Sequence, residues 1–138
     1  MKGLIFFLVI LFPYIPPSHR AGSTMRCLVE PKSVKGTLEK SVAVFSGEVL
    51  EIRNSLNLLQ ARFRVERSWK GVEAEEVWVS TDGSVESPHY RAGEKYLVFA
   101  TLSNDRLFTG SCSRTKKLEY AERDLQQLGE GKALKKAE

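Results

Sequence analysis

The chain has very little of the two residue types that most often bind metals or act as catalytic nucleophiles and bases. Only two of its 138 residues are histidine and only two are cysteine. It contains no Gly-x-Ser-x-Gly, His-Glu-x-x-His or Cys-x-x-Cys motif, and no phosphate-binding glycine loop. Only one of the histidines, His89, lies beyond the first 23 residues, whereas a zinc site needs several ligands at close spacing. These absences exclude the common metal, redox and phosphate-binding motifs.

A Ser-His-Asp triad could in principle be assembled from Ser87, His89 and either Asp82 or Asp105. Nothing in their spacing singles out such a triad, and a real site would need a base and an orienting partner in a cleft. A surface histidine is the simpler interpretation of His89. We therefore expect a protein that is not an enzyme and that uses no cofactor and no metal.

The sequence also lacks an apolar run long enough to cross a membrane as a helix, which takes about 20 residues. The longest run covers residues 4–12, follows the positive charge of Lys2 and ends at Pro13. This pattern is typical of a secretory signal peptide, which we place at residues 1–23, with cleavage before Thr24. Cleavage directly after Ala21 fits nearly as well, and an uncleaved leader that anchors the protein is a further alternative.

Arg26 precedes the first cysteine and does not fit a lipoprotein box, which argues against lipid attachment at Cys27. We therefore expect a protein that is secreted into an extracellular or periplasmic space and does not stay inserted in a membrane after cleavage. Cysteines in such an oxidising compartment are expected to pair, so the sequence predicts a disulfide between Cys27 and Cys112. Two separately buried thiols are the alternative.

A concentrated positive charge is missing as well. The whole chain carries +4, but the leader holds Lys2 and Arg20 and no acidic residue, so 19 basic residues face 17 acidic ones in the mature chain. The basic residues alternate with acidic ones along most of the sequence, whereas a nucleic-acid-binding surface needs clustered Lys and Arg with aromatic residues between them. We expect no nucleic-acid partner.

What the mature chain does contain is one domain's worth of strand patterns, at residues 24–129. Ser33 is expected to cap a short helix in which Val34 and Leu38 share a face. Apolar and polar residues alternate over residues 61–69, with Phe63, Val65 and Trp69 expected to face the core. Further strands are expected at 41–51, 76–81, 95–102 and 106–112, the one at 95–102 apolar on both faces, with a loop or irregular hairpin end at 54–59.

The period changes at residue 115, where apolar residues begin to recur every three or four positions up to Leu128. This predicts one amphipathic helix that ends at Gly129, followed by a charged, disordered tail at 130–138. The fold class is therefore mainly β. We expect a five-stranded closed antiparallel barrel with a short N-terminal helix and a C-terminal amphipathic helix, because closing the sheet leaves no free strand edges.

Four blocks, found at residues 42–49, 63–71, 93–100 and 107–113, resemble in order the tissue inhibitor of metalloproteinases superfamily. The similarity is to its N-terminal, netrin-like domain, especially in short bacterial-type relatives, and covers residues 25–128. It implies a five-stranded oligonucleotide/oligosaccharide-binding (OB) barrel with flanking helices, and a monomer whose partner is a zinc metalloproteinase.

In that family the mature protein begins Cys-x-Cys, and the amine and carbonyl of the first cysteine bind the zinc of the target protease. The resemblance places the second cysteine at Cys27, paired with Cys112, while Met25 takes the place of the first and its partner falls near Pro88. One bridge of the family is thus missing whole. The implied protease-contacting edge consists of Met25, Arg26, Cys27, Leu28, Ser87, Pro88 and His89.

The sequence and the resemblance together leave two main functions. The first is a secreted metalloendopeptidase inhibitor that acts through its mature N-terminal segment. The alternative is a secreted OB-fold binding module for a polysaccharide, a cell-envelope component or a protein partner, with no inhibitory activity. A single-stranded nucleic-acid binder is a weaker third hypothesis, because Phe63, Trp69 and Phe99 are expected to face the core rather than an exposed sheet face.

Overall fold

The computed structural model describes residues 33–55 and 57–134. With 48% strand against 17% helix, it confirms the mainly β class. The strands are β1 (Ala43–Ser55), β2 (Leu58–Lys70), β3 (Glu76–Thr81), β4 (Lys95–Ser103), β5 (Arg106–Phe108), β6 (Lys116–Lys117) and β7 (Lys132–Ala133). The helical elements are α1 (Val34–Lys40), the 3₁₀ turn η1 (Leu118–Tyr120) and α2 (Glu122–Leu128).

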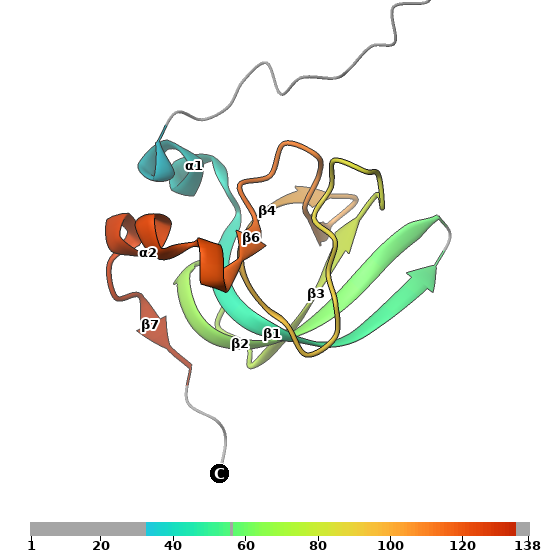
Figure 1. Cartoon of the computed structure of the whole chain (residues 1–138), viewed down its shortest axis with the longest axis horizontal. Helices are drawn as coiled ribbons and strands as arrows, with labels where there is room; N and C mark the ends of the chain where they lie inside the picture. The colour runs from blue at the N-terminus through green and yellow to red at the C-terminus, as the bar shows by residue number, and fades with distance from the viewer. Residues whose placement is uncertain (1–32, 56, 135–138) are drawn as a thin grey trace, which may run out of the picture.

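Five of the strands form a ring of pairings, β1–β2–β3–β5–β4 and back to β1, with α1 and α2 beside it (Figure 1). The expectation of an entirely antiparallel ring is wrong for one pair, because β3 and β5 run parallel where Ser80 meets Phe108. The tight turn after β4, in which Asn104 and Asp105 both have positive φ, sends β5 back along β4 and so in the direction of β3.

The interior of the ring is filled by side chains from all of its long strands and from the β3–β4 connection. Its aromatic centre consists of Phe45, Phe63, Tyr90 and Tyr96, whose rings meet edge to face at centroid distances of 5.0–6.2 Å. Edge-to-face contacts match the positive edge of one ring to the negative face of another. The predicted inward positions of Phe63 and Val65 are confirmed, since both are buried.

A second, smaller core lies between the outside of the ring and the helices. It contains Val34, Val44, Leu97, Phe99 and Ala121, and Trp69 packs against it from the edge. Trp69 changes face because β2 has an extra residue, Glu66, between the partners of Ser46 and Gly47, and Trp69 is itself the extra residue between the partners of Val44 and Phe45. Strand β4 is buried on both faces over residues 96–100, as its sequence predicts, whereas Lys95, Thr101 and Leu102 are exposed.

Helix α1 begins where expected, because the Ser33 hydroxyl accepts a hydrogen bond from the Gly36 N–H at 3.0 Å. Strands β1 and β2 are longer than expected and turn at Asn57, so residues 54–59 form the end of a hairpin. Strand β5 is shorter than expected and ends at Phe108 instead of residue 112.

The single helix expected from residue 115 is wrong. Lys116 and Lys117 form β6, which pairs with Tyr96 and Leu97 of β4, and the helical part is divided into η1 and α2. The apolar spacing still marks the buried face, because Leu118, Ala121, Leu125 and Leu128 all pack in the second core. Backbone pairing with β4 overrides the helical pattern at its start.

The expected disorder of the tail is wrong for residues 130–134. Strand β7 pairs with Arg67 and Ser68 of β2, and Leu134 packs against the core inside the ring. The Trp69 indole N–H donates to the Gly129 carbonyl at 3.0 Å, which fixes the approach of this segment. Residues 135–138 lie outside the described part of the chain.

Candidate protein-binding edge

The connection from β3 to β4 begins with a hydrogen-bonded turn built around Asp82. Its carboxylate accepts hydrogen bonds from the Ser87 hydroxyl and from the Ser84 N–H, the latter at 3.0 Å. The Ser87 N–H donates to the Ser84 carbonyl at 3.1 Å. The hydrogen bond from Ser87, followed by that from the Ser84 N–H, holds the pKa of Asp82 below its usual value. Residues 82–87 are therefore tied together by their own polar groups.

Of the three sequence-predicted edge residues in this loop, one faces inward. Ser87 is only 3% exposed, so it supports the loop and does not form its surface, whereas Pro88 is half-buried and His89 is exposed. The Nε2 atom of His89 lies 3.1 Å from the Val85 carbonyl, while Ser87 bonds to Asp82 and Ser84. Ser87, His89 and Asp82 therefore do not form a hydrogen-bonded triad.

Val85 stands out at the surface of this loop, and the sequence motifs do not identify it. Its side chain is 90% exposed, although the backbone around it is held by the hydrogen bonds of Asp82 and His89. An apolar side chain presented on an ordered turn is suited to insertion into a pocket of a partner, since little conformational entropy remains to be lost. The signal in the sequence is a lone valine between turn residues.

The loop is anchored to the interior by two tyrosines. The hydroxyl of Tyr90 lies 2.7 Å from that of Thr109, and burial raises the pKa of Tyr90 although the Thr109 and Thr115 hydroxyls oppose this. The Tyr96 hydroxyl lies 3.0 Å from the His89 carbonyl and 2.8 Å from a Glu94 carboxylate oxygen. Burial first, and then the hydrogen bond to Glu94, raise the pKa of Tyr96 to about 12, so both phenols stay protonated at neutral pH.

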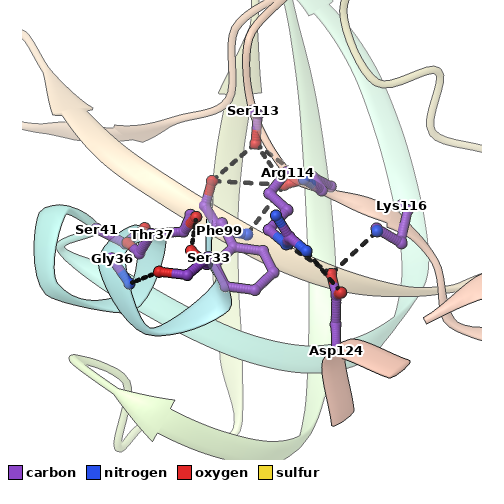
Figure 2. Close-up of polar contacts among 10 residues, drawn as sticks. Ser33, Gly36, Thr37, Ser41, Phe99, Ser113, Arg114, Lys116 and Asp124 are labelled. Carbon is purple, nitrogen blue, oxygen red and sulfur yellow. Dashed lines mark hydrogen bonds and ion pairs between the residues drawn. The ribbon is translucent and has the colours of Figure 1, made fainter. Parts of the chain in front are cut away.

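Thr109 connects this loop with the segment that carries Cys112. The Thr109 N–H donates to the Ser80 carbonyl at 2.9 Å, directly after the end of β5. From there the chain is held against β4 by side chains, since the Ser113 hydroxyl donates to the Phe99 carbonyl at 2.9 Å and Thr115 accepts from the Phe99 N–H at 2.9 Å (Figure 2). These side chains take the place of strand pairing and explain why β5 is short.

A buried carboxylate, that of Asp124, joins the chain that follows Cys112 to α2. Asp124 accepts two hydrogen bonds of 2.9 Å from the Arg114 guanidinium and lies 3.0 Å from the Lys116 ammonium (Figure 2). Burial alone would raise the pKa of Asp124, but the hydrogen bonds and charges of Arg114 and Lys116 outweigh it and lower the pKa below its usual value.

A hollow of about 300 Å³ lies beside Cys112, between α1, β4 and the 109–114 segment. It is lined by Thr37, Lys40, Ser41, Phe99, Thr101, Phe108, Gly110, Cys112, Ser113 and Arg114. Cys112 is the one cysteine among the described residues, and it is not free. The predicted partner Cys27 lies outside the described residues, as do Met25, Arg26 and Leu28, so this pairing and the N-terminal half of the edge stay predictions.

The tip of the β1–β2 hairpin lies next to the Asp82 turn. A hollow of about 430 Å³ is lined by Asn54, Ser55, Asn57, Leu58 and Leu59 of the hairpin and by Asp82 and Gly83. The hairpin tip, the loop 82–90 and the segment 109–113 therefore lie at one end of the ring, and we call them the three-loop edge. The predicted edge included the loop but not the hairpin tip.

No group of three or more His, Cys, Asp or Glu side chains in residues 33–55 and 57–134 could hold a metal ion. None of the helices in these residues is both long and apolar enough to span a membrane. No protein-family model matches the chain, and none of the curated proteins is similar enough to count as a match.

Proposed function

We propose that the chain is a secreted inhibitor of a zinc metalloproteinase, built on a five-stranded OB barrel like that of the tissue inhibitor of metalloproteinases superfamily. The barrel is supported by the ring order and by its continuous interior core. A closed ring of strands avoids free sheet edges.

One observation carries the proposal, namely the hydrogen bond between Tyr90 and Thr109, which joins the 82–90 loop to the segment of Cys112. A disulfide from Cys112 to Cys27 would hold residues 25–28 beside that loop. The partner would then meet an N-terminal segment and a rigid loop that exposes Val85 and His89.

In this proposal the free α-amine and carbonyl of the first mature residue bind the zinc of the target protease. If cleavage occurs before Met25, Arg26 is the residue that enters the specificity pocket. Pre-ordering of this edge limits the entropy lost on binding. The predicted disulfide and the Asp82 turn would supply that pre-ordering.

The experiment compares a mature chain that begins at Met25 with the same chain acetylated at its N-terminus, against a panel of zinc endopeptidases. We expect micromolar or tighter inhibition that is lost on acetylation. Val85→Asp should weaken it, and Tyr120→Ala, on the exposed 3₁₀ turn, should not. Inhibition that survives acetylation would refute zinc binding by the amine.

The second candidate, a binding module without inhibitory activity, is favoured by an exposed tryptophan, Trp78, on the outer face of the sheet. N-terminal sequencing of the secreted protein separates the two. Several residues ahead of Cys27, or a retained leader, would keep the amine out of a protease active site and leave the binding module.

A further inference from the structure

The outer face of β1, β2 and β3 carries a large aromatic side chain that neither core uses. Trp78 lies between Val77 and Val79, which pack in the ring interior, and belongs to neither core cluster. Its side chain is 36% exposed, and it pairs across the sheet with Arg62. Neither hydrophobic core accounts for a tryptophan at this position.

Two arginine guanidinium groups lie over the indole ring of Trp78. The guanidinium carbons of Arg53 and Arg62 lie 4.8 and 5.9 Å from the ring centroid. Arg62 also lies 2.9 Å from Glu76 and 3.2 Å from Glu51, and Glu51 pairs with Arg53 as well. Two guanidiniums thus face two carboxylates, and the local charge cancels.

One donor in this group is unused. The Nε atom of Arg62 is buried and has no hydrogen-bond partner among the described residues. A buried N–H without an acceptor is unfavourable, so a movement of the Arg62 side chain that brought this N–H to a ligand oxygen would gain a hydrogen bond and remove that cost.

The chemistry of the face indicates the class of ligand. A polyanion such as a nucleic acid or a sulfated glycan needs uncompensated positive charge, which this face lacks. A neutral sugar offers an apolar C–H face to an indole ring, and hydroxyl groups that both donate to carboxylates and accept from guanidiniums. We propose that Trp78, Arg62, Glu51 and Glu76 form a binding face for a neutral polysaccharide.

Arg53 is the group that must give way when a sugar approaches the ring. Its side chain is 61% exposed, and its one described ion-pair partner is Glu51, two residues away on the same strand. An exposed pair of this kind holds its partners weakly. This proposal does not rest on protease inhibition, since it uses the sheet face and not the three-loop edge.

The test is affinity electrophoresis of the full mature chain in gels that contain a neutral polysaccharide, with hydroxyethylcellulose, xylan and glucomannan each tried, and with heparin as the anionic comparison. We expect retardation by at least one neutral polymer, and roughly a tenfold or greater loss of affinity in Trp78→Ala. Tyr120→Ala is the matched control, since Tyr120 is an aromatic residue that is 72% exposed on another element. Its retardation should equal that of the wild type.

A fluorescence titration provides a readout at the site itself. The chain has two tryptophans, so Trp69→Phe leaves Trp78 as the reporter, and its emission should change on addition of the retarding polysaccharide. Raising the salt from about 0.05 to 0.5 M should leave the affinity unchanged, because no net charge is involved. Retardation by heparin alone, or equal retardation of wild type and Trp78→Ala, would overturn the proposal, as would no retardation by any of the neutral polymers.

Discussion

The hydroxyl groups of Tyr90 and Thr109 lie 2.7 Å apart, and both residues are buried. The contact joins two segments that are 19 residues apart in the chain, the loop after β3 and the segment after β5. Both segments leave the same end of the ring because β3 and β5 run parallel. This hydrogen bond therefore sets how the two sides of the three-loop edge are spaced.

Tyr90→Phe should lower the free energy of unfolding by about 1–2 kcal/mol, because the buried Thr109 hydroxyl loses a partner. Urea denaturation measures the change. Thr109→Val removes the other partner, and the double variant should cost less than the sum of the two single variants. Strict additivity would mean that the two hydroxyls do not stabilise each other.

Asp124→Asn should destabilise the chain by about 1–3 kcal/mol at neutral pH, because the buried acceptor of Arg114 and Lys116 loses its charge. The folded-state pKa of Asp124 lies below the ordinary value of 3.8, so the stabilisation is present above that pH and is lost as the pH falls through the folded-state pKa. The stability difference between variant and wild type should therefore shrink in acid.

Glu122→Gln is the matched control for Asp124, since Glu122 is exposed on the same helix. Its free energy of unfolding should stay within about 0.5 kcal/mol of the wild type. A stability difference for Asp124→Asn that stays constant from neutral pH down to below the ordinary pKa would contradict the ion-pair explanation.

Gly71→Ala should be far more damaging than Gly83→Ala. Both glycines have positive φ, of 72° and 68°, so alanine costs about 1–2 kcal/mol at either position from the backbone alone. A Cβ at residue 71 would also lie 2.0 Å from the Val42 carbonyl oxygen, whereas one at residue 83 would meet nothing within 4 Å. Thermal unfolding should show the difference, and equal midpoints would refute the steric argument.

The predicted disulfide can be tested on the secreted protein. Thiol labelling without reductant should find no reactive cysteine, and Cys27→Ser should free the thiol of Cys112. Reduction should destabilise the chain by up to about 4–5 kcal/mol, since the bridge would close a loop that spans most of the domain. Labelling of both cysteines before reduction would rule the bridge out.

The sequence predicts best those strands whose pattern is set by one local rule. Strand β3 has the predicted bounds, and β4 is buried on both faces over residues 96–100 of its apolar run. The alternation over residues 61–69 places Ser68 on the water-facing side, yet Ser68 is buried, because extra residues in β2 shift its register against β1. A bulge is decided by the partner strand, which the local alternation does not contain.

The candidate site shows the same limit. The sequence predicts that the loop with Pro88 and His89 belongs to a binding edge, but it does not show that Ser87 points inward or that Val85 is the exposed apolar residue. Those orientations depend on hydrogen bonds to Asp82 and on the parallel pairing of β3 with β5, which is a tertiary contact.

The C-terminal strand β7 lies along a stretch of β2 that β3 does not reach, where the Leu134 N–H donates to the Glu66 carbonyl at 3.1 Å. A chain that stopped at Gly129 would leave this stretch of backbone with open donors and acceptors. Such an open edge is a template for pairing with another molecule. We therefore expect β7 to protect this edge of β2 from pairing with another molecule. A chain truncated after Gly129 should aggregate in a concentration-dependent way.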